Sequence, residues 1–215
     1  MGLLRSVNVG KPTTSEHADL GVTGIVKLPA GGPVAVAAPG PKGTGGSGLA
    51  GDTVCDLRHH GGNDQAVYAY AREDLDMWAA ELGRELTDGM FGENLTTEGL
   101  DLTGARIGER WRVGGELVLE VCAARIPCRT FAGWLEERGW VKRFTQKAVT
   151  GAYLRVIEPG VIAAGDTIEV IHRPEHDVTV SLVFRALTTE RHRLPELLPA
   201  IDTVHHETRE KLALL

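Results

Sequence analysis

The sequence is poor in aromatic residues and cysteines, and it has no long apolar segment. Its 215 residues include four tryptophans, three tyrosines, four phenylalanines and three cysteines. No stretch approaches the ~18 consecutive apolar residues that a membrane-spanning helix needs, so we expect no such helix. Three cysteines form no disulfide framework, and their odd number suits a reducing compartment.

An excess of basic residues is also absent. The formal net charge is −6 at pH 7, which argues against general nucleic-acid binding because that activity needs a basic face. The first six residues lack the basic-then-apolar pattern of a secretory signal. We therefore expect a cytoplasmic protein that binds neither nucleic acid nor membranes.

Glycine, by contrast, is abundant, with 27 residues, and this favours turns and short strands over long helices. Apolar residues at helical spacing predict a helix over 72–82, ended by Gly83, and shorter helices over 131–137 and 141–149. Together these elements predict a mainly β fold with peripheral helices (α+β), built as a β-barrel or closed sandwich. The expected strands are 3–9, 24–28, 33–37, 53–57, 66–70, 107–113, 116–122, 153–157 and 167–171.

The pattern changes after Pro174. Val180, Val183 and Phe184 share one face of a predicted helix, with Asp177 or Thr179 as its N-cap. Two more helices are expected over 194–201 and 204–212. We therefore divide the chain into a barrel domain, 1–175, and a three-helix module, 176–215.

Positive charge collects around one cysteine. Residues 121–150 carry six basic and two acidic side chains, and Cys128 lies there between Arg125 and Arg129. Pro127 favours an extended approach to a helix that Thr130 can cap. A helix N-terminus and two guanidiniums favour a thiolate, so Cys128 is the candidate reactive or metal-binding thiol.

The alternative for each cysteine is a small buried apolar side chain. That interpretation suits Cys122 and Cys55, but arginines on both sides make it a poor fit for Cys128. By charge alone, a solvated helix face is the favoured interpretation of the basic segment.

Two glycine-rich turns are weaker candidates. In His60-Gly61-Gly62 the glycines allow the backbone to approach a ligand closely, whereas an exposed histidine is usually inert. The second turn, 88–95, contains Glu93 and Asn94, and taken alone it is typical of a polar surface turn.

No familiar nucleotide or metal motif accompanies these turns. The spacing Gly43, Gly45, Gly48 has prolines before it and a predicted strand after it, which is the wrong context for a dinucleotide site. His205 and His206 are adjacent on a predicted helix, do not share a face, and are expected at the solvated surface.

Five short motifs, in order, resemble the MOSC domain, the family named for the C-terminal domain of molybdenum-cofactor sulfurase. They span roughly residues 1–172, and the C-terminal helices are similar to those of the bacterial branch linked to resistance against N-hydroxylaminopurines. The motifs are Thr23-Gly24-Ile25-Val26-Lys27, Gly48-Leu49-Ala50-Gly51-Asp52, His60-Gly61-Gly62-Asn63-Asp64-Gln65-Ala66-Val67-Tyr68, Phe91-Gly92-Glu93-Asn94-Leu95 and Arg125-Ile126-Pro127-Cys128.

The resemblance implies a barrel like that of the pyruvate-kinase insert domain, and a pterin-based molybdenum cofactor whose metal is bound by Cys128. It also implies an oxidoreductase that reduces N-hydroxylated bases, hydroxylamines or amidoximes to amines or amidines. A soft metal suits a thiolate ligand, and cationic side chains suit a pterin phosphate.

On this basis we assign roles to the remaining residues. Lys27, Arg125 and Arg129 would hold the anionic groups of the cofactor, and Lys27 would also be catalytic. His60 would donate a proton or orient the substrate, since its usual pKa is ~6.5. The other assignments are the cofactor contacts Gly61, Gly62, Asn94 and Thr130, and Asp64, which would orient the His60 loop.

Two other functions remain open at this point. The protein could carry the molybdenum cofactor without turnover, or it could be a cofactor-free enzyme that uses Cys128 and His60. The reductase interpretation needs an external electron donor, because the chain shows no flavin or iron–sulfur motif. The C-terminal module is then either a cap on the barrel or a docking surface for that donor, and the protein is a monomer or a homodimer.

Overall fold

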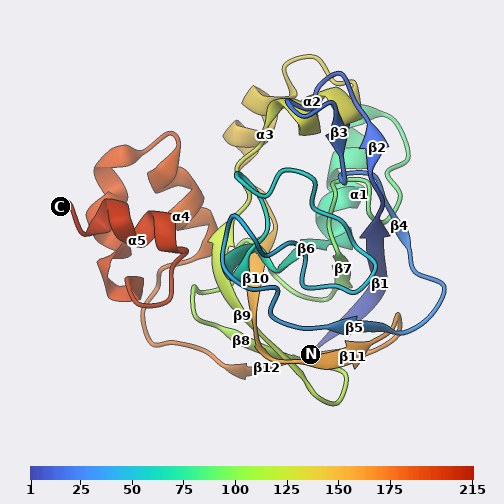
Figure 1. Cartoon of the computed structure of the whole chain (residues 1–215). Coiled ribbons are helices and arrows are strands. Elements are labelled where there is room, and N and C mark those ends of the chain that lie inside the picture. Colours follow the sequence, from blue (N-terminus) through green and yellow to red (C-terminus); the bar gives the residue numbers. More distant parts are fainter.

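The fold is a closed β-barrel with helices around it, as the sequence predicts (Figure 1). The structure, a computed structural model, describes residues 1–215. Seven strands close the barrel in the order β12-β8-β9-β10-β6-β7-β1, and β1 pairs back onto β12. All neighbours are antiparallel except β6 and β7, and β4 extends the sheet beyond β1.

The strands are short and evenly spread along the chain. Their bounds are β1 Gly2–Gly10, β2 Thr13–Thr14, β3 Val22–Thr23, β4 Lys27–Pro29, β5 Val34–Val36, β6 Val67–Ala71, β7 Leu95–Glu98, β8 Arg110–Val113, β9 Leu117–Ala124, β10 Ala152–Glu158, β11 Gly160–Ile162 and β12 Thr167–His172. The helices are η1 Asn63–Gln65, α1 Arg72–Leu82, α2 Arg129–Leu135, α3 Trp140–Lys147, α4 Val180–Leu187, η2 Arg191–Ala200 and α5 His206–Leu212.

Burial explains which strands form the wall of the barrel. Every residue of β6 and β9 is buried, because helices or loops cover their outer faces. In β8 buried and exposed residues alternate, as expected for a strand with one face in water. The barrel interior and the module together form one apolar core of 33 buried residues.

The scarce aromatic residues gather in a second core between the barrel and helices α1, α2 and α3. We call this group the aromatic cluster. Its rings meet mostly edge to face, as between Trp78 and Trp140 with centroids 4.7 Å apart, a geometry that adds to the free energy of burial. The buried members are Tyr68, Tyr70, Leu75, Trp78, Leu86, Phe91, Phe131, Leu135, Trp140 and Phe144.

Two predicted strands differ from the structure. Residues 53–57 form no strand: this segment is a loop that bonds to the end of β1 through the Thr53 amide and the Gly10 carbonyl, 2.9 Å apart. The predicted strand 24–28 is also interrupted, and only Lys27–Pro29 pairs with β1. A Cβ at Gly24 would lie 2.0 Å from the Thr53 carbonyl oxygen, so the two backbones pack too closely for a regular ladder.

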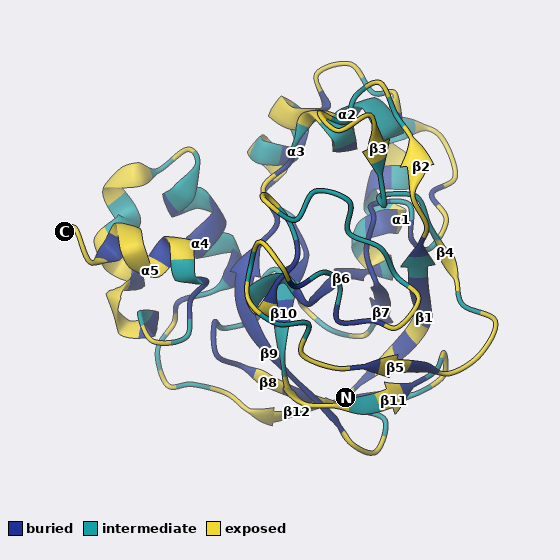
Figure 2. Cartoon of the chain, viewed as in Figure 1, coloured by how far each residue is buried: buried dark blue, intermediate teal, exposed yellow.

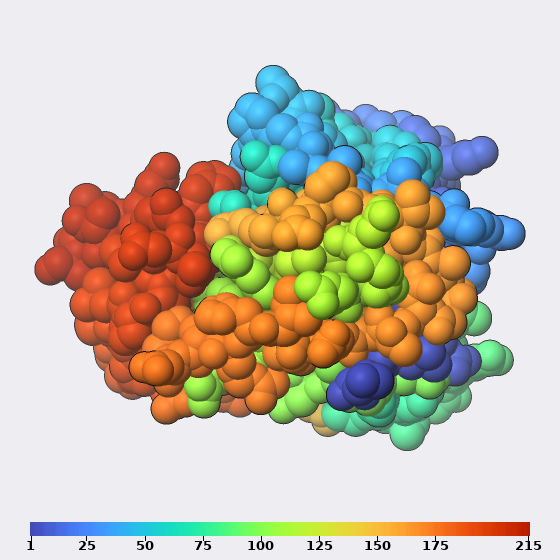
Figure 3. All heavy atoms as spheres, turned by 90° about the horizontal axis from the view of Figure 1, so that it is seen from below, coloured from blue at the N-terminus to red at the C-terminus, as the bar shows by residue number.

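The C-terminal module packs against β9 and shares the barrel's core (Figures 1 and 3). Thr179 caps α4 by accepting from the Leu182 amide, 3.2 Å away. The middle element, η2, is a 3₁₀ helix, because it contains Pro195 and Pro199. Its outer residues are exposed, as are those of α5 (Figure 2). The boundary at residue 175 remains a prediction, and the shared core joins the two parts. No helix has the length and apolarity to cross a membrane.

Candidate functional site

A cavity of about 390 Å³ opens beside the aromatic cluster. Four segments that are distant in the sequence line it, 17–27, 47–65, 92–94 and 125–130, together with Tyr68 and Tyr153. The structure thereby brings together eight of the ten side chains or glycines assigned from the sequence. These are Lys27, His60, Gly61, Asn94, Arg125, Cys128, Arg129 and Thr130, whereas Gly62 and Asp64 do not line the cavity.

The guanidinium of Arg125 is the most unusual group of the cavity. The residue is 7% exposed, forms no ion pair, and leaves its buried Nε atom without a hydrogen-bond partner. Its guanidinium carbon lies 4.4 Å from the ring centroid of Phe131 and 4.8 Å from that of Tyr68. Cation–π contacts offset only part of the cost of a buried charge. The Arg125 guanidinium therefore has no anionic partner within the protein.

Cys128 is next to this charge in the same wall. It is the N-cap of α2, with an extended backbone (φ −128°, ψ 173°), and Pro127 favours an extended conformation of the preceding residue, Ile126. Its side chain is half-buried against the aromatic cluster and forms no disulfide. The thiol therefore faces a cavity that also holds an unpaired guanidinium.

The two residues after Cys128 anchor the segment 15–21 rather than the helix. Thr130 does not cap α2, because Cys128 has that position, and the Thr130 hydroxyl instead donates to the His17 carbonyl at 3.1 Å. Arg129 is exposed and donates to the Glu16 carbonyl at 2.8 Å. Both contacts hold one rim of the cavity.

The opposite charges of Lys27 and Asp52 form a buried ion pair in the cavity. Burial lowers the pKa of Lys27, and Asp52 opposes that shift. Asp52 also accepts from the Asn94 side chain at 2.8 Å and from the Gly10 amide at 2.7 Å. Sequence reasoning assigned no role to Asp52, although the residue ends one of the five motifs; its partner Lys27 is 25 positions away.

His60 is half-buried and uncharged at neutral pH. Burial and the nearby Arg125 charge lower its pKa from 6.5 to about 4. The following glycines have φ of 80° and 78°, and a Cβ on Gly62 would lie 2.7 Å from the Cα of Lys42. Their role is therefore to let two loops pack closely, and only Gly61 reaches the cavity.

Asp64 points away from the cavity, toward the C-terminal module. Its carboxylate pairs with Arg155 at 2.9 Å and accepts from the amide and Nδ1 of His206, at 2.8 and 3.0 Å. The prediction that His205 and His206 are solvated is wrong for His205, which is 6% exposed. Cys122 is buried as predicted, but Cys55 is half-buried and lines the cavity.

Comparison with known proteins assigns the family. A family model described as MOSC domain matches residues 56–169. The chain belongs to the MOSC-domain family. The uncharacterized protein YflK of Bacillus subtilis is 35% identical over 181 residues, which cover 84% of this chain and 78% of YflK.

Two further sequence relatives of this MOSC protein and one solved structure agree with the assignment. YiiM of Escherichia coli is 32% identical over 62% of this chain and 60% of its own. A protein of Gibberella moniliformis named reductase is 32% identical over 71% of this chain, which spans 29% of that longer protein. The crystal structure of YiiM from Geobacillus stearothermophilus superposes with a TM-score of 0.78 at 26% identity, covering 99% of this chain and 98% of YiiM.

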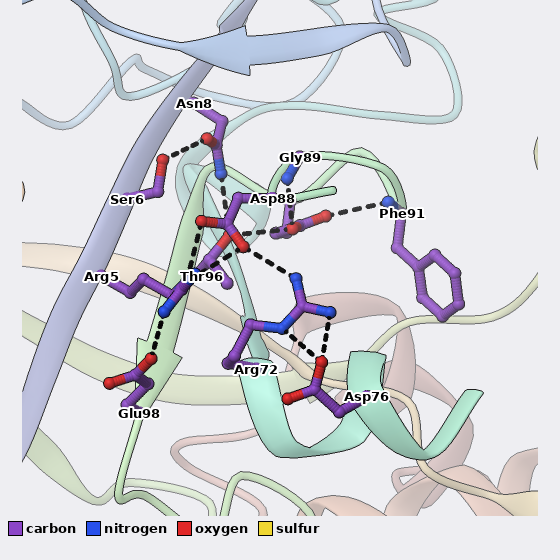
Figure 4. A network of polar contacts seen from close by, with 11 residues as sticks. Arg5, Ser6, Asn8, Arg72, Asp76, Asp88, Gly89, Phe91, Thr96 and Glu98 are labelled. Carbon is purple, nitrogen blue, oxygen red and sulfur yellow. Dashed lines mark hydrogen bonds and ion pairs between the residues drawn. The ribbon is translucent and has the colours of Figure 1, made fainter. Parts of the chain in front are cut away.

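One buried carboxylate shapes the MOSC motif 91–95. Glu93 is fully buried and accepts from the Gly89 and Phe91 amides and from the Thr96 hydroxyl, at 2.6, 3.0 and 2.9 Å. These bonds fix the turn that presents Asn94 to the cavity. An ion-pair network surrounds the start of the turn, joining Arg5, Arg72, Asp76, Asp88 and Glu98 (Figure 4).

Stability should depend on the ionisation of Glu93. Burial raises the pKa of this carboxyl from 4.5 to about 7. Because the folded-state pKa is raised, the stabilisation is complete below pH ~4.5 and is lost as the pH rises toward 7, a change of about 3 kcal/mol. We expect Glu93→Gln to abolish this contribution to the slope of the free energy of unfolding against pH, measured by denaturant unfolding between pH 5 and 8. Equal slopes for the variant and the wild type would contradict the assignment; Glu98→Gln, at a half-buried carboxylate of the neighbouring network, is the control.

Proposed function

We propose that this MOSC protein binds the molybdenum cofactor and uses it to reduce N-hydroxylated compounds to amines or amidines. One observation carries the proposal: a buried guanidinium without an anion, Arg125, lines the same cavity as the thiol of Cys128. MOSC domains are associated with molybdenum-cofactor binding in general, and the relative named reductase supports an oxidoreductase.

The residues of the cavity fit such a cofactor. Arg125 would hold an anionic group of the pterin, and its unpartnered Nε offers a donor for it. Cys128 would be the ligand of molybdenum, since a thiolate suits a soft metal. When bound, the cofactor would supply transfer of two electrons at the metal.

Protons must come from the protein or the solvent. Conversion of R–NH–OH to R–NH₂ and water takes up two electrons and two protons. Lys27 is the better donor, because burial lowers the pKa of its ammonium while Asp52 holds it in place. His60, neutral at pH 7, is suited to orient the substrate through a hydrogen bond rather than to protonate it.

The alternatives are a cofactor carrier and a cofactor-free enzyme that uses Cys128 and His60. No hydrogen bond joins these two residues, although both line the cavity. A nucleophilic pair needs its base within hydrogen-bond reach, so the geometry favours the cofactor-dependent functions. The carrier differs from the reductase only in turnover.

The test is expression in hosts that do and do not make the cofactor. We expect about one molybdenum per chain only from the competent host, and reduction of an amidoxime with an artificial electron donor only by that preparation. Bound molybdenum without reduction would identify a carrier. Activity from the cofactor-deficient host would refute the proposal. A physiological reductase is the proposed source of electrons in the cell.

Three apolar side chains at the rim should select the substrate. Leu20, Val22 and Ile126 line the cavity yet are 56%, 39% and 48% exposed. We expect Leu20→Ser with Ile126→Ser to lower kcat/KM for an aromatic amidoxime about tenfold, because apolar contact is lost. Hydroxylamine, which has no apolar part, should be unaffected. Leu198→Ser, 44% exposed on the module, is the matched control; an equal loss for both substrates would contradict this role.

A further inference from the structure

The start of α5 contacts the two loops that form one wall of the cavity. Lys42, in the glycine-rich loop 39–48, pairs with Glu207 at 2.6 Å. Asp64, at the end of the loop 56–65, binds the amide and ring of His206 at 2.8 and 3.0 Å. The guanidinium of Arg155 joins Asp64 at 2.9 Å to the Val204 carbonyl at 3.4 Å.

These loops are also bound to each other. The Gly62 amide donates to the Gly45 carbonyl at 2.9 Å, and Gly62 packs on the backbone of Lys42. His60 precedes this contact by two residues, and its own amide bonds to the Asp56 carbonyl at 2.9 Å. A movement of either loop would therefore displace the imidazole that faces Arg125 and the cavity.

The group Asp64, His205 and His206 has the residue types of a metal site, with potential ligand atoms within 4.8 Å of one another. Most of its polar atoms, however, already take part in helix capping, and only His205 Nε2 is buried without a partner. His205 Nδ1 accepts from the Glu207 amide at 3.2 Å, and Asp64 accepts from His206. Arg155 adds a positive charge on the same carboxylate, which opposes a cation. The group is therefore better explained as a mechanical contact than as a metal site.

We propose that the C-terminal module is a positioning element for the cavity, which holds the His60 wall in place through the Asp64–His206 and Lys42–Glu207 contacts. Asp64, Lys42, His206 and Glu207 are thus positioning residues, none of which touches the cavity. Asp64 orients the His60 loop, and it does so from the module side rather than from within the site.

Burial and charge support this role. Asp64 is 17% exposed at its side chain. Burial opposes its ionisation, but hydrogen bonds from His206 and the Arg155 charge lower the pKa of this carboxyl, so it is ionised at neutral pH. Partly buried, charge-assisted bonds such as those of Asp64 are stronger than exposed ion pairs, so they contribute more than the Lys42–Glu207 pair, whose Glu207 side chain is 51% exposed. The module also cannot move away as a unit without exposing the core that it shares with the barrel.

The decisive experiment measures amide hydrogen exchange in the full chain. The test variant, His206→Ala with Glu207→Gln, changes only the module: it removes the ring bond to Asp64 and the pair with Lys42, and keeps the bond from the His206 amide. Its matched control, Arg193→Gln with Glu196→Gln, removes two ion pairs within the module, those of Arg193 with Glu196 at 2.9 Å and with Glu190 at 3.0 Å. We expect exchange in residues 56–66 to rise about tenfold in the test variant and not in the control. Lys42→Met, which removes the barrel partner of Glu207, should raise exchange in residues 56–66 by a smaller factor.

A second readout follows the histidine itself. Loosening the wall should admit water, so the pKa of His60, followed by NMR and assigned with His60→Gln, should rise from about 4 toward 6.5 in the test variant alone. Exchange that rises in 205–212 but not in 56–66 would overturn the inference, as would an unchanged His60 pKa.

The relevance of this wall to catalysis rests on the proposed function, but both readouts need no cofactor and no turnover. Their failure would overturn the inference and leave the reductase intact. Absence of molybdenum from protein made in the competent host would refute the proposed function and leave this inference intact.

Discussion

Cys128→Ser is expected to yield a folded protein whose molybdenum content is lower than that of the wild type by about 100-fold or more, and which does not reduce amidoximes. The reason is chemical rather than steric. A hydroxyl is a hard, weakly acidic group that replaces poorly a thiolate on a soft metal. Ser has nearly the same volume, and Cys128 is half-buried at the edge of the aromatic cluster. Stability should therefore change by less than about 1 kcal/mol.

The chain supplies its own control for this variant. Cys55 lines the same cavity and is also a free thiol, but burial raises the pKa of Cys55 and thus disfavours its thiolate. We expect Cys55→Ser to retain the metal. Metal content, measured beside thermal unfolding, separates loss of a ligand from loss of the fold. Metal retained in Cys128→Ser and lost in Cys55→Ser would place the ligand at the other cysteine.

Arg125→Met is expected to have effects of opposite sign on stability and on function. In the protein without a ligand the guanidinium is buried and unpaired, so an apolar side chain of similar length should leave the free energy of unfolding unchanged or raise it by up to about 2 kcal/mol. Loss of the charge-assisted hydrogen bonding that the guanidinium offers should weaken retention of an anionic cofactor by about 100-fold or more. Such a trade-off marks a residue kept for binding.

Thermal unfolding of the apo-protein and molybdenum content of the loaded protein are the two measurements. Arg129→Met is the matched control, since Arg129 is exposed and hydrogen-bonds only the Glu16 carbonyl; its effect on retention should be below about tenfold. A large loss of stability in Arg125→Met with unchanged retention would show that the guanidinium is structural.

Local signals in the sequence predicted much of this architecture. The helix 72–82 has the predicted bounds, because its apolar spacing and the left-handed Gly83 are properties of adjacent residues. The setting of Cys128, after a strand and before a helix, was predictable for the same reason. Thr130 was wrong as a cap because Cys128 takes that position.

Local sequence signals could not predict the contacts between segments that are distant in the chain. Lys27 with Asp52, and Asp64 with His206, join residues 25 and 142 positions apart. Nothing near Asp64 in the sequence indicates that its carboxylate faces a C-terminal helix. The prediction of a strand over 53–57 was wrong for a similar reason. The conformation of this segment depends on the close approach of Gly24 to Thr53, which are distant in the sequence.

The gathering of aromatic side chains gives the protein an intrinsic optical probe. Trp78, Trp134 and Trp140 all belong to or pack on the aromatic cluster, while Trp111 alone lies in the barrel core. In a Trp111→Phe background, indole emission would report only on the cluster behind Arg125. Its fluorescence could then distinguish melting of the helices around the cavity from opening of the barrel, two events that a single circular-dichroism transition would merge.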